Sequence, residues 1–336
     1  MTDMVLHANG GISRRMRPRA RSGRMSAQPL SSLWDPVCPT CLATLARIAP
    51  DERRCERCEV SYRREGGIWL MLSEGRQDVF RAFVEQYETV RTAEGRRLQN
   101  PEHLKALPFR DLSRRRPYEW GIRARSFESL LRRVVIPLER ASGHALRALD
   151  LGSGLGWLAY RLALRGHEVA GVDLLTNDFD GLGVHRQYDR AFVAIQAEFD
   201  RLPFPDACLD LVIYNASFHY AQDYPAALRE AFRVLTPAGR VVIMDTPIYR
   251  DPSSGAAMVR EREDAFEAQF GFRGNALASE GFLTYDRLTL LAGELAIRWQ
   301  FIEPWYGVRW LFKPWFARIR RLREPARFKL VVGHRR

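Results

Sequence analysis

One stretch of the sequence, Leu149-Asp150-Leu151-Gly152-Ser153-Gly154-Leu155-Gly156, indicates the fold more strongly than any other. An apolar segment typical of a strand leads into it, and a segment with helical periodicity follows it. Glycines at such a junction let the backbone turn sharply and let a ligand approach without a Cβ in the way. The stretch therefore predicts a ligand-binding turn between a strand and a helix of an α/β domain.

Acidic residues near this turn distinguish two kinds of nucleotide ligand. A dinucleotide site would have its third glycine where this chain has Trp157, and the carboxylate of Asp150 would repel a pyrophosphate. That carboxylate suits a cofactor with ammonium and sulfonium groups. Asp173 ends the next predicted strand, 17 residues after Gly156, where it can accept hydrogen bonds from both ribose hydroxyls. The alternative role of both acids is helix capping or strand termination.

Further motifs follow in the order seen in class I S-adenosylmethionine-dependent methyltransferases. They are Gly171-Val172-Asp173, Glu198–Asp206, Asp210–Asn215 and Arg233–Gly239. Residues 118–336 resemble this class, and in particular the broad group that includes ubiquinone and menaquinone C-methyltransferases. The motifs are specific to the superfamily and do not indicate a substrate.

Apolar segments alternate with helical ones along the same part of the chain, which predicts a parallel sheet covered on both faces. We expect a doubly wound, mostly parallel seven-stranded sheet of the α/β class, with the last strand antiparallel. Predicted strands cover 145–151, 168–173, 191–197, 209–215, 240–245, 297–302 and 327–333, and predicted helices cover 119–141, 157–164, 226–235 and 286–296.

The resemblance implies a set of cofactor-binding residues. Asp150, Gly152 and Gly154 would line the methionine end of the cofactor. Asp173 would hold the ribose, and Asn215 would face the sulfonium. The full set is Asp150, Gly152, Gly154, Gly156, Asp173, Glu198, Phe199 and Asn215. Glu198 would face the adenine amino group, where the family usually has Asp, and Phe199 would lie beside the ring.

A candidate general base follows the fourth strand, in Ser217-Phe218-His219-Tyr220. His219 could remove a proton from an acceptor, or it could simply pack at the start of a helix. Enzymes that methylate base amines often have two prolines after the asparagine, and their absence after Asn215 argues against that substrate. Cys208 is typical of a small buried apolar residue rather than a nucleophile.

Two cysteine pairs near the N-terminus indicate a metal site. Cys38 and Cys41 are separated from Cys55 and Cys58 by 13 residues. Two such pairs suit tetrahedral zinc held by four thiolates, and a closed site of this kind is structural. A unit this short has too small a core to fold unaided, so the metal would stabilise it.

The segment resembles the small zinc-ribbon proteins that activate methyltransferases as separate subunits. Ribosomal RNA guanine N1-methyltransferases also begin with a zinc ribbon, but theirs usually contains a histidine that this chain lacks between Cys41 and His103.

The net charge of +12 is concentrated at the two ends of the chain. Residues 1–30 contribute +5 and residues 305–336 contribute +9, which leaves residues 31–304 at −2. A nearly neutral body weakens the case for nucleic-acid binding. The arginine-rich start is not followed by an apolar stretch, so we expect no export signal and a cytoplasmic location.

These patterns divide the chain into four parts. We expect a disordered basic tail at 1–33, a zinc-ribbon-like domain at 34–72, a helical linker at 73–117 and the methyltransferase domain at 118–336. Helical periodicity in the linker involves Val79, Phe80, Phe83, Val84 and Tyr87.

Two variable regions bear on the substrate and partners. An aromatic-rich insertion at about 246–285 could form a lid over an apolar acceptor, because loops at this end of the sheet build the ligand site. Packing of a helical cap explains the same residues. Residues 304–328 interleave aromatic and basic side chains, which suits a membrane surface, stacked RNA bases or a helix packed on the body.

The sequence thus predicts a methyltransferase that uses S-adenosylmethionine and methylates a small, partly apolar or isoprenoid-linked metabolite. An RNA methyltransferase that grips RNA through the zinc ribbon and the basic ends is the main alternative. A non-catalytic cofactor-binding partner of another protein is a second.

Overall fold

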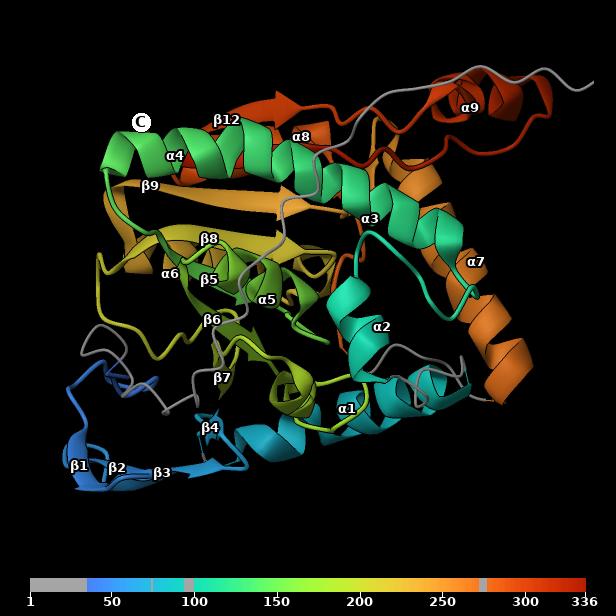
Figure 1. Ribbon diagram of the computed structural model, residues 1–336. Coiled ribbons are helices and arrows are strands. Elements are labelled where there is room, and N and C mark those ends of the chain that lie inside the picture. Colours follow the sequence, from blue (N-terminus) through green and yellow to red (C-terminus); the bar gives the residue numbers. More distant parts are fainter. Residues whose placement is uncertain (1–34, 74, 94–99, 272–276) are drawn as a thin grey trace, which may run out of the picture. The chain divides into compact units, whose positions relative to one another are not determined.

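The computed structural model describes residues 35–73, 75–93, 100–271 and 277–336, and Asp35–Arg336 form one compact unit. The predicted basic tail, 1–33, lies outside the described residues. The unit is built on one large sheet in the order β1-β2-β3-β4-β7-β6-β5-β8-β9-β13-β12 (Figure 1). Its strands are β1 (Ala46–Ala49), β2 (Glu52–Cys55), β3 (Val60–Glu65), β4 (Ile68–Leu70), β5 (Arg147–Leu151), β6 (Glu168–Asp173), β7 (Val193–Gln196), β8 (Leu209–Asn215), β9 (Leu235–Met244), β12 (Ile297–Ile302) and β13 (Leu330–Arg335).

The part of the sheet from β7 to β12 has the predicted doubly wound form. Neighbours among β7, β6, β5, β8 and β9 pair in parallel, whereas β13 is antiparallel to both β9 and β12. Every residue of the central strand β8 is buried, as expected for a parallel strand covered on both faces. The predicted fold class is confirmed, including the antiparallel last strand.

Helices cover both faces of this sheet. They are α1 (Arg76–Ala93), α2 (Pro101–Ala106), α3 (Pro117–Leu130), α4 (Ile136–Ser142), α5 (Trp157–Leu164), α6 (Tyr224–Val234), α7 (Pro252–Phe270), α8 (Tyr285–Glu294) and α9 (Val308–Ile319), with a π-turn at Leu131–Val135 between α3 and α4 and 3₁₀ turns at Leu182–Gln187 and Phe218–Tyr220.

Side-chain alternation along the strands assigns the helices to faces. Leu211 and Ile213 of β8 belong to the same apolar cluster as Phe127 of α3 and Trp157 of α5. Because successive strand residues point to opposite faces, Tyr214 faces the other side, and its hydroxyl donates to a carbonyl of α6. Thus α3 and α5 cover one face, and α6 covers the other.

The cysteine-rich segment joins this sheet instead of standing apart from it. Its last strand, β4, pairs in parallel with β7, so that Ile68 lies opposite Ala194. Ile68 packs with Ala194 and Leu182 in a small buried cluster. Strands β3, β2 and β1 then extend the same sheet outward. The domain boundaries at 34–72 and 118–336 stay predictions. The backbone hydrogen bonds between β4 and β7 connect the two segments.

Some predicted bounds differ from the observed ones. The last strand was expected at 327–333 but spans Leu330–Arg335, because the backbone of Arg327 instead bonds to Ile248 in β10 (Ile248–Tyr249). Beside β10 lies β11 (Leu283–Thr284), and between the two the insertion forms α7. In the described part of the chain, no helix is long and apolar enough to cross a bilayer.

Candidate cofactor and acceptor site

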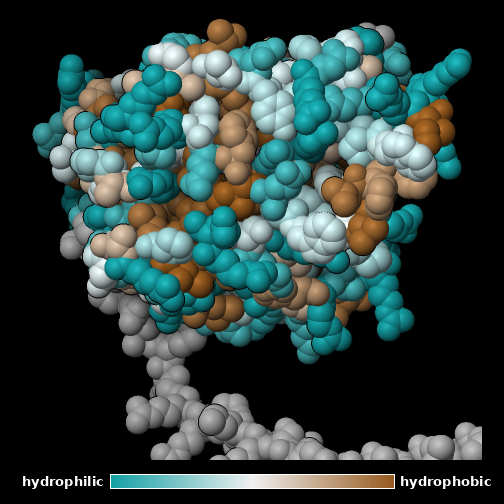
Figure 2. Space-filling model, turned by 90° about the horizontal axis from the view of Figure 1, so that it is seen from above, coloured by the Kyte–Doolittle hydropathy of each residue, from teal (hydrophilic) through white to brown (hydrophobic). Residues whose placement is uncertain are grey.

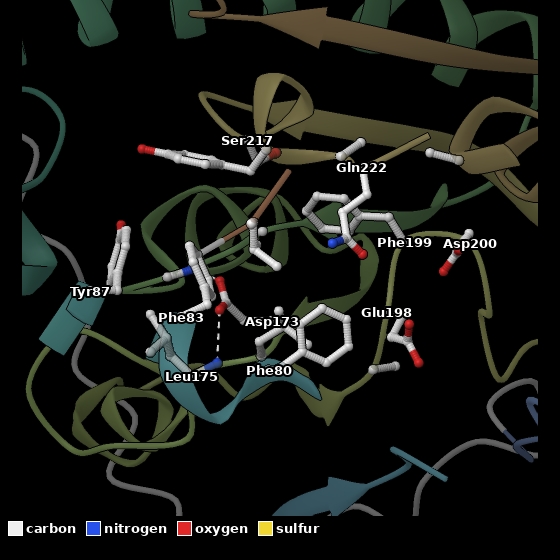
Figure 3. A pocket seen from close by; sticks show the side chains of 18 of the residues that line it. Phe80, Phe83, Tyr87, Asp173, Leu175, Glu198, Phe199, Asp200, Ser217 and Gln222 are labelled. Carbon is white, nitrogen blue, oxygen red and sulfur yellow. Dashed lines mark hydrogen bonds between the residues drawn. The ribbon is translucent and has the colours of Figure 1, made fainter. Parts of the chain in front are cut away.

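A pocket lies at the edge of the sheet where the central parallel strands end. Residues following β5, β6, β7 and β8 line it, and α1 closes one side. Five of the predicted cofactor residues are in its wall: Gly152, Gly154, Asp173, Glu198 and Phe199. Figure 3 shows Asp173 near the centre, with Phe83 and Tyr87 on one side and Glu198 and Asp200 on the other. This edge of the sheet is where doubly wound folds bind ligands.

The glycine loop closes over the pocket in a conformation that other residues rarely adopt. Gly152 has φ +71°, and a Cβ built on it would lie 2.3 Å from the Cβ of Ser217. Gly154 also has positive φ. Gly156 does not line the pocket; it begins α5, and a Cβ there would meet the Phe192 ring at 2.5 Å. The structure thus gives Gly152 and Gly154 pocket positions and gives Gly156 a packing position.

Asp150 is buried beneath this loop and does not line the pocket. Neither of its carboxylate oxygens accepts a hydrogen bond of ordinary geometry from a described residue. Burial raises its pKa to about 8, which the Ala159 N–H offsets only in part. A buried carboxylate without a partner is costly, so either a bound proton or a nearby positive charge would stabilise this position.

Asp173 holds the loop from the neighbouring strand. Its Oδ2 accepts from the Gly154 N–H over 2.8 Å, and its Oδ1 accepts from the Leu175 N–H over 2.9 Å. Burial raises the pKa of this carboxyl to about 6. Since a carboxylate can accept about four hydrogen bonds, capacity remains for hydroxyl groups in the pocket.

Glu198 has a protein partner that the sequence did not indicate. The Arg76 Nε donates to Oε1 over 2.9 Å and to Oε2 over 3.1 Å, and its Nη2 donates to Oε2 over 2.5 Å. The Glu198 side chain is only 5% exposed, so the pair fastens the start of α1 to the loop after β7. Any contact with an adenine amino group would have to share this carboxylate with Arg76.

The two remaining predicted cofactor residues have different surroundings. Phe199 lines the pocket, and its ring packs edge-on against Tyr214 with centroids 5.5 Å apart. Asn215 is buried at the end of β8 and outside the pocket wall, and its Oδ1 has no hydrogen-bond partner among the described residues. Its neighbours Ala216 and Ser217 are the residues that reach the wall.

His219 lies behind the pocket rather than in its wall. It is buried in the 3₁₀ turn after β8, and its ring lies 4.3 Å from that of Tyr220, which does line the pocket. Its Nδ1 has no partner in the described chain. Burial, with a smaller contribution from Arg262, lowers its pKa to about 3. The imidazole is therefore neutral near physiological pH.

Helix α1 supplies pocket residues from a segment that the sequence analysis assigned to a linker. Phe80, Phe83 and Tyr87 line the pocket. The rings of Phe83 and Tyr87 lie 5.6 Å apart, and each is within 6.4 Å of the Tyr220 ring. Their periodicity predicted a helix, but the sequence carried no signal of what the helix covers. Together these rings form an apolar wall.

The insertion contributes little to this pocket. Of its described residues, Leu277 is the one that reaches the wall. Phe282 packs on Tyr249 and Gly255 instead, while α7 runs along the outside. For the described part of the insertion, packing of a helical cap therefore explains the aromatic residues better than a lid over the pocket does.

The four N-terminal cysteines converge as their spacing predicted. Their sulfur atoms all lie within 4.8 Å of one another, with Cys38 and Cys58 at 3.9 Å and Cys41 and Cys55 at 3.5 Å. Thiolates around a tetrahedral zinc ion, at about 2.3 Å from it, are about 3.8 Å apart. The arrangement fits such an ion. Cys208 lies elsewhere, and burial raises the pKa of its thiol to about 11, which makes it a poor nucleophile.

The cofactor expected from the sequence can be tested against this geometry. A cationic group of a ligand near the glycine loop would offset the charge of the buried, unpartnered Asp150 carboxylate. Gly152 and Gly154 have no side chain and present their backbone to the pocket. Asp173 lies where a ribose would need an acceptor. The donor set fits S-adenosylmethionine, while Asp150 disfavours a pyrophosphate.

Comparison with known proteins agrees. Residues 149–243 match the family described as "Methyltransferase domain". Together with the topology and the glycine loop, this match shows that the chain contains a class I, S-adenosylmethionine-dependent methyltransferase domain. The predicted class is confirmed.

Particular relatives have different substrates. A malonyl-[acyl-carrier protein] O-methyltransferase of Erwinia pyrifoliae is 35% identical over 100 residues, which cover 30% of this chain and 37% of that protein. A demethylmenaquinone methyltransferase of Thermus thermophilus is 34% identical over 134 residues, covering 37% and 56%. Among solved structures, a possible histamine N-methyltransferase of Thermotoga maritima has 16% identity and a TM-score of 0.41, covering 77% of this chain and 99% of that chain. The chain spans between about a third and about a half of the length of these curated relatives.

Proposed function

We propose that the protein transfers a methyl group from S-adenosylmethionine to a small, partly apolar or isoprenoid-linked metabolite. The observation that carries this proposal is the composition of the pocket: glycine backbone and Asp173 on one side, and the rings of Phe83, Tyr87 and Tyr220 on the other. Relatives named for menaquinone precursors and for an acyl-carrier-protein conjugate support acceptors with apolar parts.

Positioning would supply most of the catalysis. The cofactor provides an electrophilic methyl group, and holding an acceptor in line with it lowers the entropic part of the barrier. Apolar rings hold a flat or aliphatic acceptor and exclude water from it. The proposed division places the cofactor against Gly152, Gly154 and Asp173, and the acceptor against the α1 wall.

A base is needed only where the acceptor must lose a proton. His219 stays the candidate, since a neutral imidazole with a free Nδ1 can accept one. Its low pKa makes it a weak base, and the Tyr220 ring stands beside it. We therefore propose for His219 an auxiliary role at most.

We further propose that the cysteine cluster holds one structural zinc ion. Four sulfur ligands at tetrahedral spacing leave no open position for catalysis. The ion would hold the two cysteine pairs together. Because β2 and β3 lie on either side of Cys58 in the chain, it would also stabilise these two strands.

The first experiment follows labelled methyl from S-adenosylmethionine into an extract of the source organism. We expect label in the organic-soluble fraction, and much less of it with an Asp173→Ala variant at a limiting concentration of S-adenosylmethionine. Label in RNA would replace this proposal with the RNA methyltransferase alternative. Cofactor binding without transfer to any fraction would point to a non-catalytic partner protein.

A further inference from the structure

Helix α9 lies on the surface of the molecule, and none of its residues is buried. It lies between β12 and β13 in the chain, at the end of the sheet toward which β9 points (Figure 1). Large apolar side chains are exposed all along it and at both of its ends: Trp305, Val308, Leu311, Phe312, Trp315, Phe316, Ile319 and Leu322, each between 48% and 64% exposed. Figure 2 shows apolar surface gathered toward this end of the molecule. Packing on the body, one of the roles considered for residues 304–328, does not account for these side chains.

The exposed residues form a single face. With 3.6 residues per turn, the side chains from Val308 to Ile319 fall on one side of the helix. Trp310 points the opposite way, and its ring lies 4.9 Å from Tyr306 and 5.6 Å from Phe328 on the body. The helix therefore rests on its Trp310 side and presents its apolar face to the surroundings. Contiguous apolar surface of this kind marks an interaction site.

Basic side chains border this face. Residues 308–323 contain six arginines and lysines and no acidic residue. Arg309 and Arg320 flank one side of the apolar face, and Arg318 flanks the other. Among the described residues no carboxylate pairs with Arg309, Arg318, Arg320 or Arg321, and all four are exposed. Arg323 is the exception, since it pairs with Glu261 over 2.8 Å.

We propose that α9 binds flat on an anionic lipid surface, with its apolar face inserted at the headgroup boundary. A basic-flanked apolar helix with tryptophans is the pattern of interfacial membrane helices. Anionic headgroups complement the unpaired arginines. Residues such as Leu311, Ile319 and Leu322 gain by entering an acyl layer, whereas they cannot stack on RNA bases. A second copy of the chain would bring like charges together across a symmetric contact.

The docked face lies at the same edge of the sheet as the pocket. At the base of α9, the Tyr306 hydroxyl lies 2.8 Å from the Ser126 hydroxyl, which donates to Asp245 over 2.5 Å. Asp245 follows β9 directly, as Ala216 follows β8. A lipid surface against α9 would thus adjoin the carboxyl ends of the strands. The inference goes beyond the proposed function and does not depend on the acceptor's identity.

Flotation of the full chain with lipid vesicles tests the proposal. Vesicles of phosphatidylcholine with about a third phosphatidylglycerol should carry the protein, and pure phosphatidylcholine vesicles should carry much less. Trp315→Ser/Phe316→Ser/Ile319→Ser should reduce the bound-to-free ratio at least about tenfold. Arg318→Gln/Arg320→Gln/Arg321→Gln should also reduce it by about tenfold or more, and added salt should mimic that loss.

Matched variants control for general surface effects. Val79→Ser/Leu164→Ser/Leu290→Ser removes apolar residues that are exposed singly on other helices. Arg47→Gln/Arg54→Gln/Arg63→Gln removes three exposed charges from the cysteine-rich segment. Both should float as the unchanged protein does, and retained circular dichroism should show that all variants fold.

Three results would overturn the proposal. One is equal flotation of the apolar variant and the unchanged protein. Another is absent flotation together with salt-sensitive binding of a single-stranded RNA oligonucleotide that the variants lose, which would make α9 an RNA-binding helix. The third is a dimer in light scattering that the apolar variant dissociates while no form floats.

Discussion

Two carboxylates at the ends of neighbouring strands are held in environments that oppose their charge. Asp150 has no hydrogen-bond partner for its oxygens within the described residues, whereas Asp173 accepts two backbone N–H bonds. Burial raises the pKa of Asp150 to about 8 and that of Asp173 only to about 6. The difference follows from those backbone donors, which stabilise a charged carboxylate.

The raised pKa of Asp150 predicts how the cofactor-free protein responds to pH. Between the ordinary value of 3.8 and about 8, the folded protein holds a proton that the unfolded chain has lost. Stability is therefore full below the lower value and falls as pH rises through the upper one. Asp150→Asn should remove that part of the decline in melting temperature, while the exposed control Asp264→Asn should keep it. Equal slopes in the three proteins would show that Asp150 is not buried in this way.

Asp173 should matter for cofactor affinity. Replacing it by Ala removes an acceptor for two hydroxyl groups, and hydrogen bonds to a charged group contribute about 1.5–3 kcal/mol each. Calorimetry should show S-adenosylmethionine binding weakened by about a hundredfold or more. Asp173→Asn, which keeps one acceptor oxygen for the loop, should lose less, and Asp264→Ala should lose nothing. Undiminished affinity in a folded Asp173→Ala protein would remove this residue from the site.

At the scale of single elements, α1 is the helix that contributes most side chains to the pocket wall among the described residues. Its aromatic face closes the pocket, and Arg76 at its start holds the buried Glu198. Arg76 and Glu198 are 122 positions apart in the chain, so this contact depends on the tertiary fold.

The α1 wall should determine acceptor binding and not cofactor binding. Phe83→Ala and Tyr87→Ala each remove a ring that faces the pocket, so KM for the acceptor should rise about tenfold, as for the loss of roughly 1.5 kcal/mol of apolar contact. The dissociation constant for S-adenosylmethionine should change little. Val79→Ala is the control, because that side chain lies on the same helix and is half exposed. A rise in the cofactor constant alone would place these rings at the cofactor.

The Arg76–Glu198 pair should also stabilise the fold. Arg76→Ala leaves a buried carboxylate unpaired, which we expect to cost about 2 kcal/mol in the free energy of unfolding, measured with urea. Adding Glu198→Gln should recover part of that loss. Arg186→Ala breaks an ion pair with Asp178, whose side chain is 72% exposed, and should cost less than about 1 kcal/mol. Equal costs for the two arginines would mean that the Glu198 pair is screened by solvent.

Local patterns explain what the sequence could and could not predict. The glycine loop and Asp173 were predictable because their backbone conformation and position at a strand end depend on nearby residues. The aromatic wall was not, because the periodicity of Phe80, Phe83 and Tyr87 shows that a helix has an apolar face but not what that face covers. The partner of Glu198 was missed for the same reason. His219 was placed correctly after β8, yet its burial behind Tyr220 depends on packing between distant segments.

At the scale of the whole molecule, the cysteine-rich segment and the doubly wound fold share one sheet. One structural route from the segment to the pocket runs through β4, which pairs with β7, and β7 leads directly to Glu198 and Phe199. A second contact is the hydrogen bond from the Val37 N–H to the Pro203 carbonyl, over 3.1 Å, in the loop that follows. If β4 were lost, β7 would become the exposed edge of the sheet, without hydrogen bonds on one side. We expect β7 and the loop that follows it to become less stable as a result. Damage to the cysteine cluster should therefore reach the cofactor site.

Zinc analysis and chelation test this coupling. We expect about one zinc ion per chain after dialysis. Removing it with a chelator, or changing Cys55→Ser, should lower the melting temperature by roughly 5 °C or more and should weaken S-adenosylmethionine binding, because an unfolded cysteine segment withdraws β4 from β7. Cys208→Ser is the control, since that thiol lies outside the cluster. A cluster that binds no zinc would refute the metal site. Zinc loss that lowers stability with unchanged cofactor affinity would instead show that β7 holds its position without β4, and that the segment is joined to the sheet but not coupled to the site.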